Sequence, residues 1–212
     1  GRREGRGGAL GGGPVARGLK DAPFLQWKPA DARYRYLLTF DAADGVPGGD
    51  FSVADVWETR SWEQVAQWRG RTPPDRFGDI CYGLGSMYGW AVIWGEVKTP
   101  GNVVMSRLQS LTYPNLASWP EANRPGEPGW LTTDKLKAAM VTDARTAVQK
   151  LDVRLNSVHS IAELKTFVVL TPRDRLRRPG APVIMGAQAG CHDDTVTTLM
   201  GAVYALKRFS LD

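Results

Sequence analysis

The segment Tyr34-Arg35-Tyr36-Leu37-Leu38-Thr39-Phe40-Asp41 is a run of aromatic and aliphatic residues that ends on an acid. Such a run is typical of a buried strand, and it places Asp41 at the C-terminal end of that strand. A glycine-rich loop follows, and then the apolar stretches Phe51 to Glu58 and Trp62 to Arg69 flank a short polar turn. That arrangement predicts a hairpin. The first three strands are therefore expected to form an antiparallel meander.

Helical patterns and one further strand follow the meander. Ala91 to Trp94 predicts a short buried strand that leads to Glu96. Helices are expected to begin near Thr72, Asn102, Thr132 or Thr133, Ser160 and Asp193. The third is expected to bury a stripe that ends at Leu151, and Ser160 with Glu163 fits a capping box for the fourth. A strand near Val183 to Met185 is also expected. The pattern favours an α/β fold with a mixed central sheet flanked by helices.

Length and composition indicate one globular domain. The 212 residues are 42% hydrophobic, which is enough for a single core. Residues 1–25 are rich in glycine and arginine and are expected to be a flexible linker, which leaves 26–212 as the domain. The longest apolar runs fall far short of a membrane span, so no membrane association is predicted. Two cysteines without a CxxC pattern indicate a reducing, intracellular compartment.

The net charge of +5 is unevenly distributed along the chain. Residues 1–20 carry +4 and residues 171–180 carry +3, which leaves the remainder slightly acidic. This division suits a protein whose body holds cations and whose basic segments meet phosphate. The alternative is that both basic runs are only solvated surface.

Carboxylates at the ends of predicted elements are the main chemical signal. Asp41 and Glu96 end two strands, and Asp193 with Asp194 opens the last helix. Side chains at adjacent strand ends and a nearby helix start can share one cation, and hard oxygen ligands select Mg²⁺ or Mn²⁺. Two such ions about 4 Å apart support phosphodiester hydrolysis. Each aspartate alone could equally be a turn former or a helix cap.

Other catalytic schemes lack their residues. The chain contains two histidines and no HExxH motif, and Cys191 beside His192 lacks the remaining ligands of a zinc site. There is no GxxxxGK[ST] motif, so the chain itself is not expected to hydrolyse ATP by a P-loop mechanism. Cys81 lies on the apolar face of its predicted helix and is expected to belong to the core.

The order of these motifs resembles the nuclease domain of the large terminase subunit of tailed bacteriophages. Five elements carry the resemblance over about residues 34–208: Phe40-Asp41 with Gly49-Asp50-Phe51-Ser52, Ala91 to Glu96 with Pro100-Gly101, Gly129-Trp130 with Thr132-Thr133, Glu163-Leu164 with Phe167, and Cys191-His192-Asp193-Asp194. The resemblance implies an RNase H-like fold and a two-metal endonuclease that cuts concatemeric viral DNA during genome packaging. It also implies the cytoplasm of an infected bacterium as the location.

The resemblance assigns roles and partners as well. Asp41, Glu96, Asp193 and Asp194 become metal ligands, and Asp50 becomes an auxiliary acid. An ATPase motor domain would precede this chain, whose linker would be its remnant, and the portal and small terminase subunit would be partners. The chain departs from the family at Val97-Lys98-Thr99, where an asparagine-rich stretch is frequent. Lys98 could contact a phosphate there.

The basic segment after the Phe167 element is the expected contact with double-stranded DNA. Its arginines are Arg173, Arg175, Arg177 and Arg178. Contacts of this kind go to phosphate and are largely indifferent to base sequence. Two alternatives remain open from the sequence: another RNase H-like enzyme, such as a Holliday-junction resolvase or a recombinase, and a non-catalytic DNA-binding or assembly module.

Overall fold

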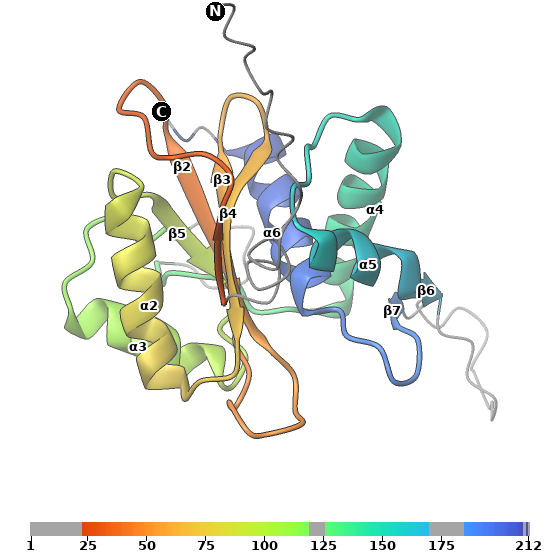
Figure 1. Ribbon diagram of the computed structural model, residues 1–212, viewed down its shortest axis with the longest axis horizontal. Helices are drawn as coiled ribbons and strands as arrows, with labels where there is room; N and C mark the ends of the chain where they lie inside the picture. Colours follow the sequence, from red (N-terminus) through yellow and green to blue (C-terminus); the bar gives the residue numbers. More distant parts are fainter. Residues whose placement is uncertain (1–22, 119–125, 170–184, 210, 212) are drawn as a thin grey trace, which may run out of the picture.

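The computed structural model describes residues 23–118, 126–169, 185–209 and 211. A five-stranded sheet with the order β1-β4-β3-β2-β5 forms its centre, and β6 and β7 make a separate two-stranded sheet (Figure 1). The strands are β1 Phe24–Gln26, β2 Tyr36–Asp41, β3 Ser52–Glu58, β4 Glu63–Gly70, β5 Val92–Gly95, β6 Phe167–Val169 and β7 Met185–Ala187.

Strand pairing confirms the predicted mixed sheet. β2, β3 and β4 form the antiparallel meander, and β5 joins β2 in parallel. The parallel register aligns Phe40 with Gly95. Asp41 and Glu96 are the next residues on the two strands, so they lie at neighbouring strand ends, about 4.8 Å apart in the direction of pairing.

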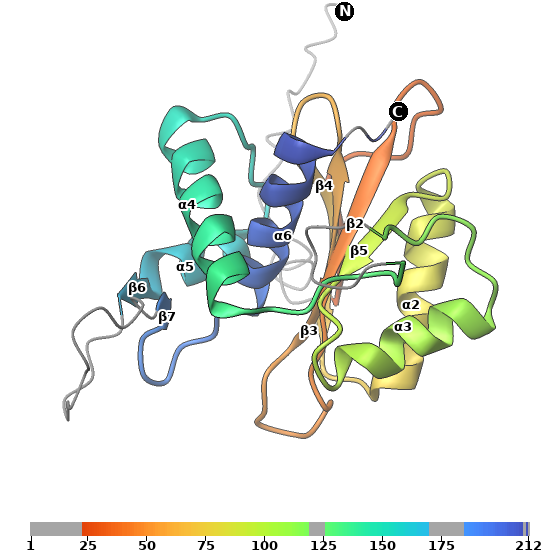
Figure 2. The same ribbon diagram turned by 180° about the vertical axis from the view of Figure 1, so that it is seen from behind.

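Helices cover both faces of the sheet. They are α2 Pro74–Met87, α3 Gly101–Ser110, α4 Asp134–Lys150, α5 Val158–Thr166 and α6 Asp194–Arg208. Figures 1 and 2 show α2 and α3 together on one face, with α6 against the other face and α4 and α5 outside it. Each face has its own apolar core. The layout is the α/β architecture expected from the sequence.

Alternation along β3 explains how one strand serves two cores. The strand is buried throughout, with Ala54 and Val56 in the core under α2 and α3, and Trp57 in the core under α6. Trp57, Trp94 and Trp130 are fully buried on the α6 side. This packing holds α6 close to β2, where the Thr39 hydroxyl donates to the Thr198 carbonyl at 3.0 Å. The beginning of α6 is thereby brought to the strand end that carries Asp41.

Several local details of the structure differ from what the sequence patterns indicated. The boundary predicted at residue 25 falls inside β1, which pairs with β4. Ser157, not Ser160, caps α5, and its hydroxyl accepts from two backbone N–H groups. Leu151 ends α4 in the left-handed conformation with 86% of its surface exposed, so it is not part of the buried stripe. The strand expected near Val183 to Met185 is Met185–Ala187 in the described residues.

None of the helices described is both long and apolar enough to cross a membrane.

Candidate metal centre

Two strand ends supply the first pair of carboxylates. Asp41 is the last residue of β2, and Glu96 follows β5, where its backbone N–H donates to the Phe40 carbonyl at 3.2 Å. Gly101 opens α3 beside this point, and a Cβ on it would lie 1.9 Å from the Glu96 carbonyl oxygen. The glycine therefore allows α3 to begin directly against the backbone of Glu96. Both side chains are half-buried.

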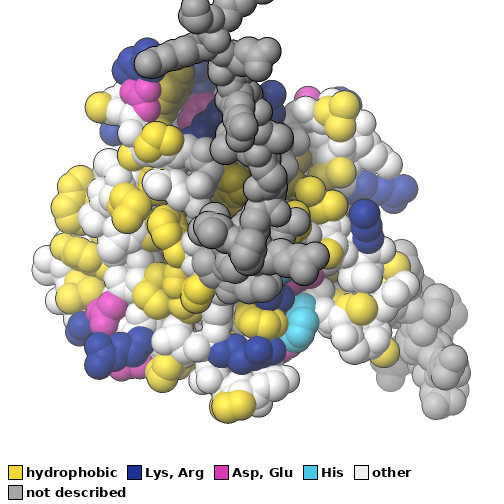
Figure 3. All heavy atoms as spheres, in the orientation of Figure 1, with side chains coloured by type: hydrophobic (Ala, Val, Ile, Leu, Met, Phe, Trp, Pro, Cys, Tyr) yellow, Lys and Arg dark blue, Asp and Glu magenta, His cyan; other side chains and the backbone are white. Residues whose placement is uncertain are grey.

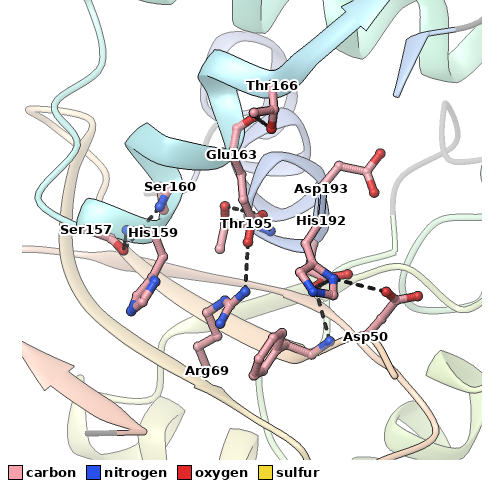
Figure 4. Close-up of polar contacts among 12 residues, drawn as sticks. Asp50, Arg69, Ser157, His159, Ser160, Glu163, Thr166, His192, Asp193 and Thr195 are labelled. Carbon is pink, nitrogen blue, oxygen red and sulfur yellow. Dashed lines mark hydrogen bonds and ion pairs between the residues drawn. The ribbon is translucent and has the colours of Figure 1, made fainter. Parts of the chain in front are cut away.

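The first turn of α6 supplies the second pair. Asp194 is 7% exposed, and its carboxylate accepts a 3.1 Å hydrogen bond from the backbone N–H of Phe51. Asp193 occupies the N-cap position but makes no side-chain capping bond, and Figure 4 shows its side chain pointing away from His192 and Asp50. The sequence left both aspartates as candidate ligands, and Asp194 is the more enclosed member of the pair.

Electrostatics show that these carboxylates act on one another. Loss of solvent raises the pKa of Asp41 well above its usual range, and three nearby carboxylates raise it further. They belong to Glu96, Asp194 and Asp193. Desolvation also raises the pKa of Asp194 to about 6, although the Phe51 N–H and His192 oppose that rise. Within the described part of the chain, Asp41, Glu96 and Asp193 form no ion pair with a basic residue. Among the described residues, these three carboxylates thus concentrate negative charge without a basic partner.

A tighter group lies at the same end of the sheet. Ligand atoms of Asp50, His192 and Asp194 all lie within 4.8 Å of one another, the one such group of three among the described residues. His192 Nδ1 is 3.1 Å from Asp50 Oδ1 and 3.7 Å from Asp194 Oδ2 (Figure 4). Basic and acidic side chains gather on the lower part of the face seen in Figure 3. Asp41, Glu96 and Asp193 interact electrostatically at this end of the sheet but are not members of so close a group.

His192 is the residue that the sequence argument set aside. It was weighed only as a zinc ligand beside Cys191, and its partner Asp50 is 142 positions away in the chain. The run Cys191-His192-Asp193-Asp194, with four consecutive residues of metal-ligating types, was the available signal. Asp50 itself lies beside His192 and the enclosed Asp194.

The loop residue Phe51 links the acids to two arginines. Its ring lies under the Arg69 guanidinium at 3.5 Å and the Arg71 guanidinium at 3.8 Å, and its edge meets the His192 ring. Arg69 is enclosed and pairs with Glu163 at 3.0 Å, whereas Arg71 is exposed and donates to the Gly49 carbonyl at 2.8 Å. The charge of Arg69 is therefore matched by a carboxylate, whereas Arg71 keeps an exposed positive charge beside the Asp50 loop.

The predicted DNA contacts are only partly visible. Lys98 is exposed beyond Glu96, at the rim of the same sheet end. The four arginines predicted to contact DNA, Arg173, Arg175, Arg177 and Arg178, lie outside the described residues.

Comparison with known proteins places this geometry in a structural group. No family model and no curated protein sequence matches the chain. Among solved structures, the large terminase nuclease from thermophilic phage G20c with bound magnesium is 16% identical, with a TM-score of 0.68 over 86% of this chain and 87% of that one. The same nuclease with bound cobalt is 17% identical, with a TM-score of 0.70 over 86% and 87%.

A second phage gives the same result. The Thermus phage P74-26 large terminase nuclease domain is 16% identical, with a TM-score of 0.67 over 91% of this chain and 90% of that one. The resemblance read from the motifs is thus confirmed at the level of fold. This chain has the RNase H-like fold of the large terminase nuclease domains of phages.

Proposed function

We propose that this protein is a DNA endonuclease that depends on divalent metal ions. The observation that carries the proposal is the meeting of carboxylates from the end of β2, the residue after β5 and the start of α6 at one end of the sheet. Burial raises the pKa of Asp41 there, and the neighbouring carboxylates raise it further. Crowded carboxylates without a basic partner weaken a fold unless a cation offsets their repulsion. A bound divalent ion would remove that cost.

The donor set fits Mg²⁺ or Mn²⁺. Carboxylate oxygens dominate the site, which suits hard cations, and the single imidazole of His192 is compatible with Mn²⁺ as well. Asp41, Glu96 and Asp194 are the residues that would hold the ions, with Asp193 at the rim and Asp50 as an auxiliary acid. The similar phage G20c nuclease has been solved with bound magnesium, cobalt and zinc, which supports divalent binding at such a site.

The chain's own groups prepare the site for phosphodiester hydrolysis. Two divalent ions held there would activate a water molecule and stabilise the leaving oxygen of a DNA strand. The Phe51 N–H fixes one oxygen of Asp194 and leaves the other available to a ligand. The exposed Arg71 and Lys98 lie at the rim, where DNA phosphates would approach, and the arginines at 173, 175, 177 and 178 would extend that contact.

The fold supports a biological setting for this activity. We place the protein in viral DNA packaging, where it would cut concatemeric double-stranded DNA in the cytoplasm of an infected bacterium. A preceding ATPase motor domain, the portal and the small terminase subunit are the partners that this setting requires.

Plasmid cleavage tests the proposal. Supercoiled plasmid incubated with the protein and Mn²⁺ or Mg²⁺ should be nicked and then linearised. Asp41→Ala should not cut, while Asp152→Ala, which changes an exposed aspartate after α4, should cut like the wild type. Failure of the wild type with both ions, or equal cleavage by Asp41→Ala, would contradict the proposal.

A second substrate separates the related alternatives. Plain linear duplex and a four-way junction of the same sequence should be cut at similar rates by a packaging nuclease. Strict dependence on the junction would instead favour a Holliday-junction resolvase with the same fold.

A further inference from the structure

Helix α6 begins without a cap of its own. An aspartate at the N-cap position ordinarily accepts a hydrogen bond from the backbone N–H two or three residues later. Asp193 holds that position and makes no such bond. The acceptor comes from α5 instead: Glu163 Oε2 accepts from the Thr195 backbone N–H at 2.8 Å and from the Thr195 hydroxyl at 2.6 Å. Glu163 thus caps α6 from another element (Figure 4).

Glu163 is itself held from two sides. Its other oxygen, Oε1, accepts a 3.0 Å bond from Arg69 of β4, and the residue is only 7% exposed. One turn earlier on α5, Ser160 is buried against Gln64 and Gln67 of the same strand. These contacts with β4 hold the Glu163 carboxylate in place relative to the sheet.

Glu163 is also connected to the acidic site through Arg69 and Phe51. Arg69 stacks on the ring of Phe51, and the Phe51 N–H donates to Asp194. Glu163 pairs with Arg69, so the charge of this guanidinium is matched by a carboxylate of α5. Without Glu163, an unpaired arginine would lie close to the acids and compete with a cation for them.

We propose that Glu163 is a positioning residue, which caps α6 in place of Asp193 and keeps both aspartates of that helix start available to a divalent cation. The cation half of this proposal rests on the proposed function, whereas the capping half stands on the hydrogen bonds alone. Glu163 touches neither substrate nor metal. It acts through Thr195 on one side and through Arg69 and Phe51 on the other.

Two measurements on the apo and Mn²⁺-bound protein test it. The first is amide hydrogen exchange at Thr195 relative to Val203 in the core of the same helix. The second is Mn²⁺ affinity by calorimetry. Glu163→Ala should accelerate the relative exchange of Thr195 and should weaken Mn²⁺ binding by about 10- to 100-fold, the range seen when groups that orient metal ligands are lost. Glu163→Gln keeps an acceptor for Thr195 but loses the charge facing Arg69, so its effect should be intermediate.

Glu63→Gln is the matched control. Glu63 is also a buried glutamate that pairs with an arginine, Arg154. It lies at the first residue of β4, at the end of the strand opposite to Arg69. Its substitution should lower stability without changing the relative exchange of Thr195 or the affinity for Mn²⁺. Wild-type exchange and affinity in Glu163→Ala, or an equal loss of affinity in Glu63→Gln, would overturn the proposal. A wild-type chain that binds no Mn²⁺ would overturn the proposed function; Thr195 exchange would then still decide the capping.

Discussion

Asp41 and Asp55 lie on neighbouring antiparallel strands, β2 and β3, and both carboxyl groups lose solvent when the chain folds. Their surroundings differ. Asp55 accepts hydrogen bonds from the Gln64 and Gln67 side-chain amides and from the Thr198 hydroxyl. Asp41 has a hydrogen bond with the Thr197 side chain but faces three other carboxylates. A buried acid with its lone pairs satisfied stabilises a particular packing, while one that faces like charges is kept for a ligand that the chain does not supply.

The largest difference between Asp41 and Asp55 should appear in the rate of plasmid cleavage when each is substituted. Asp41→Asn removes a charge from the proposed metal site, so the rate of plasmid nicking should fall by at least about 100-fold, equivalent to about 2.7 kcal/mol of activation free energy. Asp55→Asn is the same substitution on the neighbouring strand, and it should keep the nicking rate within about 10-fold of the wild type. Comparable losses in the two variants would erase the distinction.

Mn²⁺ should stabilise the Asp55→Asn variant against unfolding but not the Asp41→Asn variant. At 100 times its dissociation constant, Mn²⁺ should raise the free energy of unfolding by about 2.7 kcal/mol, because only the folded state assembles the site. The increase should persist in Asp55→Asn and disappear in Asp41→Asn, as followed by chemical denaturation with and without Mn²⁺. In the absence of metal, Asp41→Asn should be more stable than the wild type, because the repulsion among carboxylates is relieved.

The pH dependence of the free energy of unfolding should reveal the contribution of Asp55. Burial raises the pKa of Asp55 from 3.8 to about 6, so the folded chain holds this proton more tightly than the unfolded chain. Stability should therefore fall as pH rises from about 4 to 6, with a contribution from Asp55 on the order of 3 kcal/mol. Denaturation of the metal-free protein across this range should show a shallower fall in Asp55→Asn. Identical slopes would mean that the proton is not held at Asp55.

The smallest change in stability is expected at Ser160, at the edge of the hydrogen-bond network around Asp55. Ser160 accepts weak hydrogen bonds from the Gln64 and Gln67 side chains, at 3.3 Å and 3.2 Å. Ser160→Ala should lower the free energy of unfolding by about 1 kcal/mol, the net value of a typical buried hydrogen bond. Plasmid cleavage should not change, and a large loss of activity would show that the network and the acidic site are not separate.

The sequence predicted what depends on neighbouring residues. The strand that ends at Asp41, the hairpin after it and the strand before Glu96 all follow from local apolar patterns, and the structure confirms them. Glu163 looked like the end of a capping box that began at Ser160, whereas its carboxylate contacts Thr195, 32 positions away. The pairing of His192 with Asp50 was equally invisible to local patterns. Asp55 reads as one polar residue in an apolar strand, and its partners become evident only when β4 and α6 lie against it.

Crystals soaked in Mn²⁺ and measured at an anomalous wavelength test the central claim most directly. Manganese should lie at the end of the sheet, with oxygens of Asp41 and Asp194 at about 2.1 Å, the distance typical of small divalent ions. No manganese is expected at Asp55. A fully soaked crystal whose anomalous density avoids Asp41, Glu96 and Asp194 would contradict the central claim.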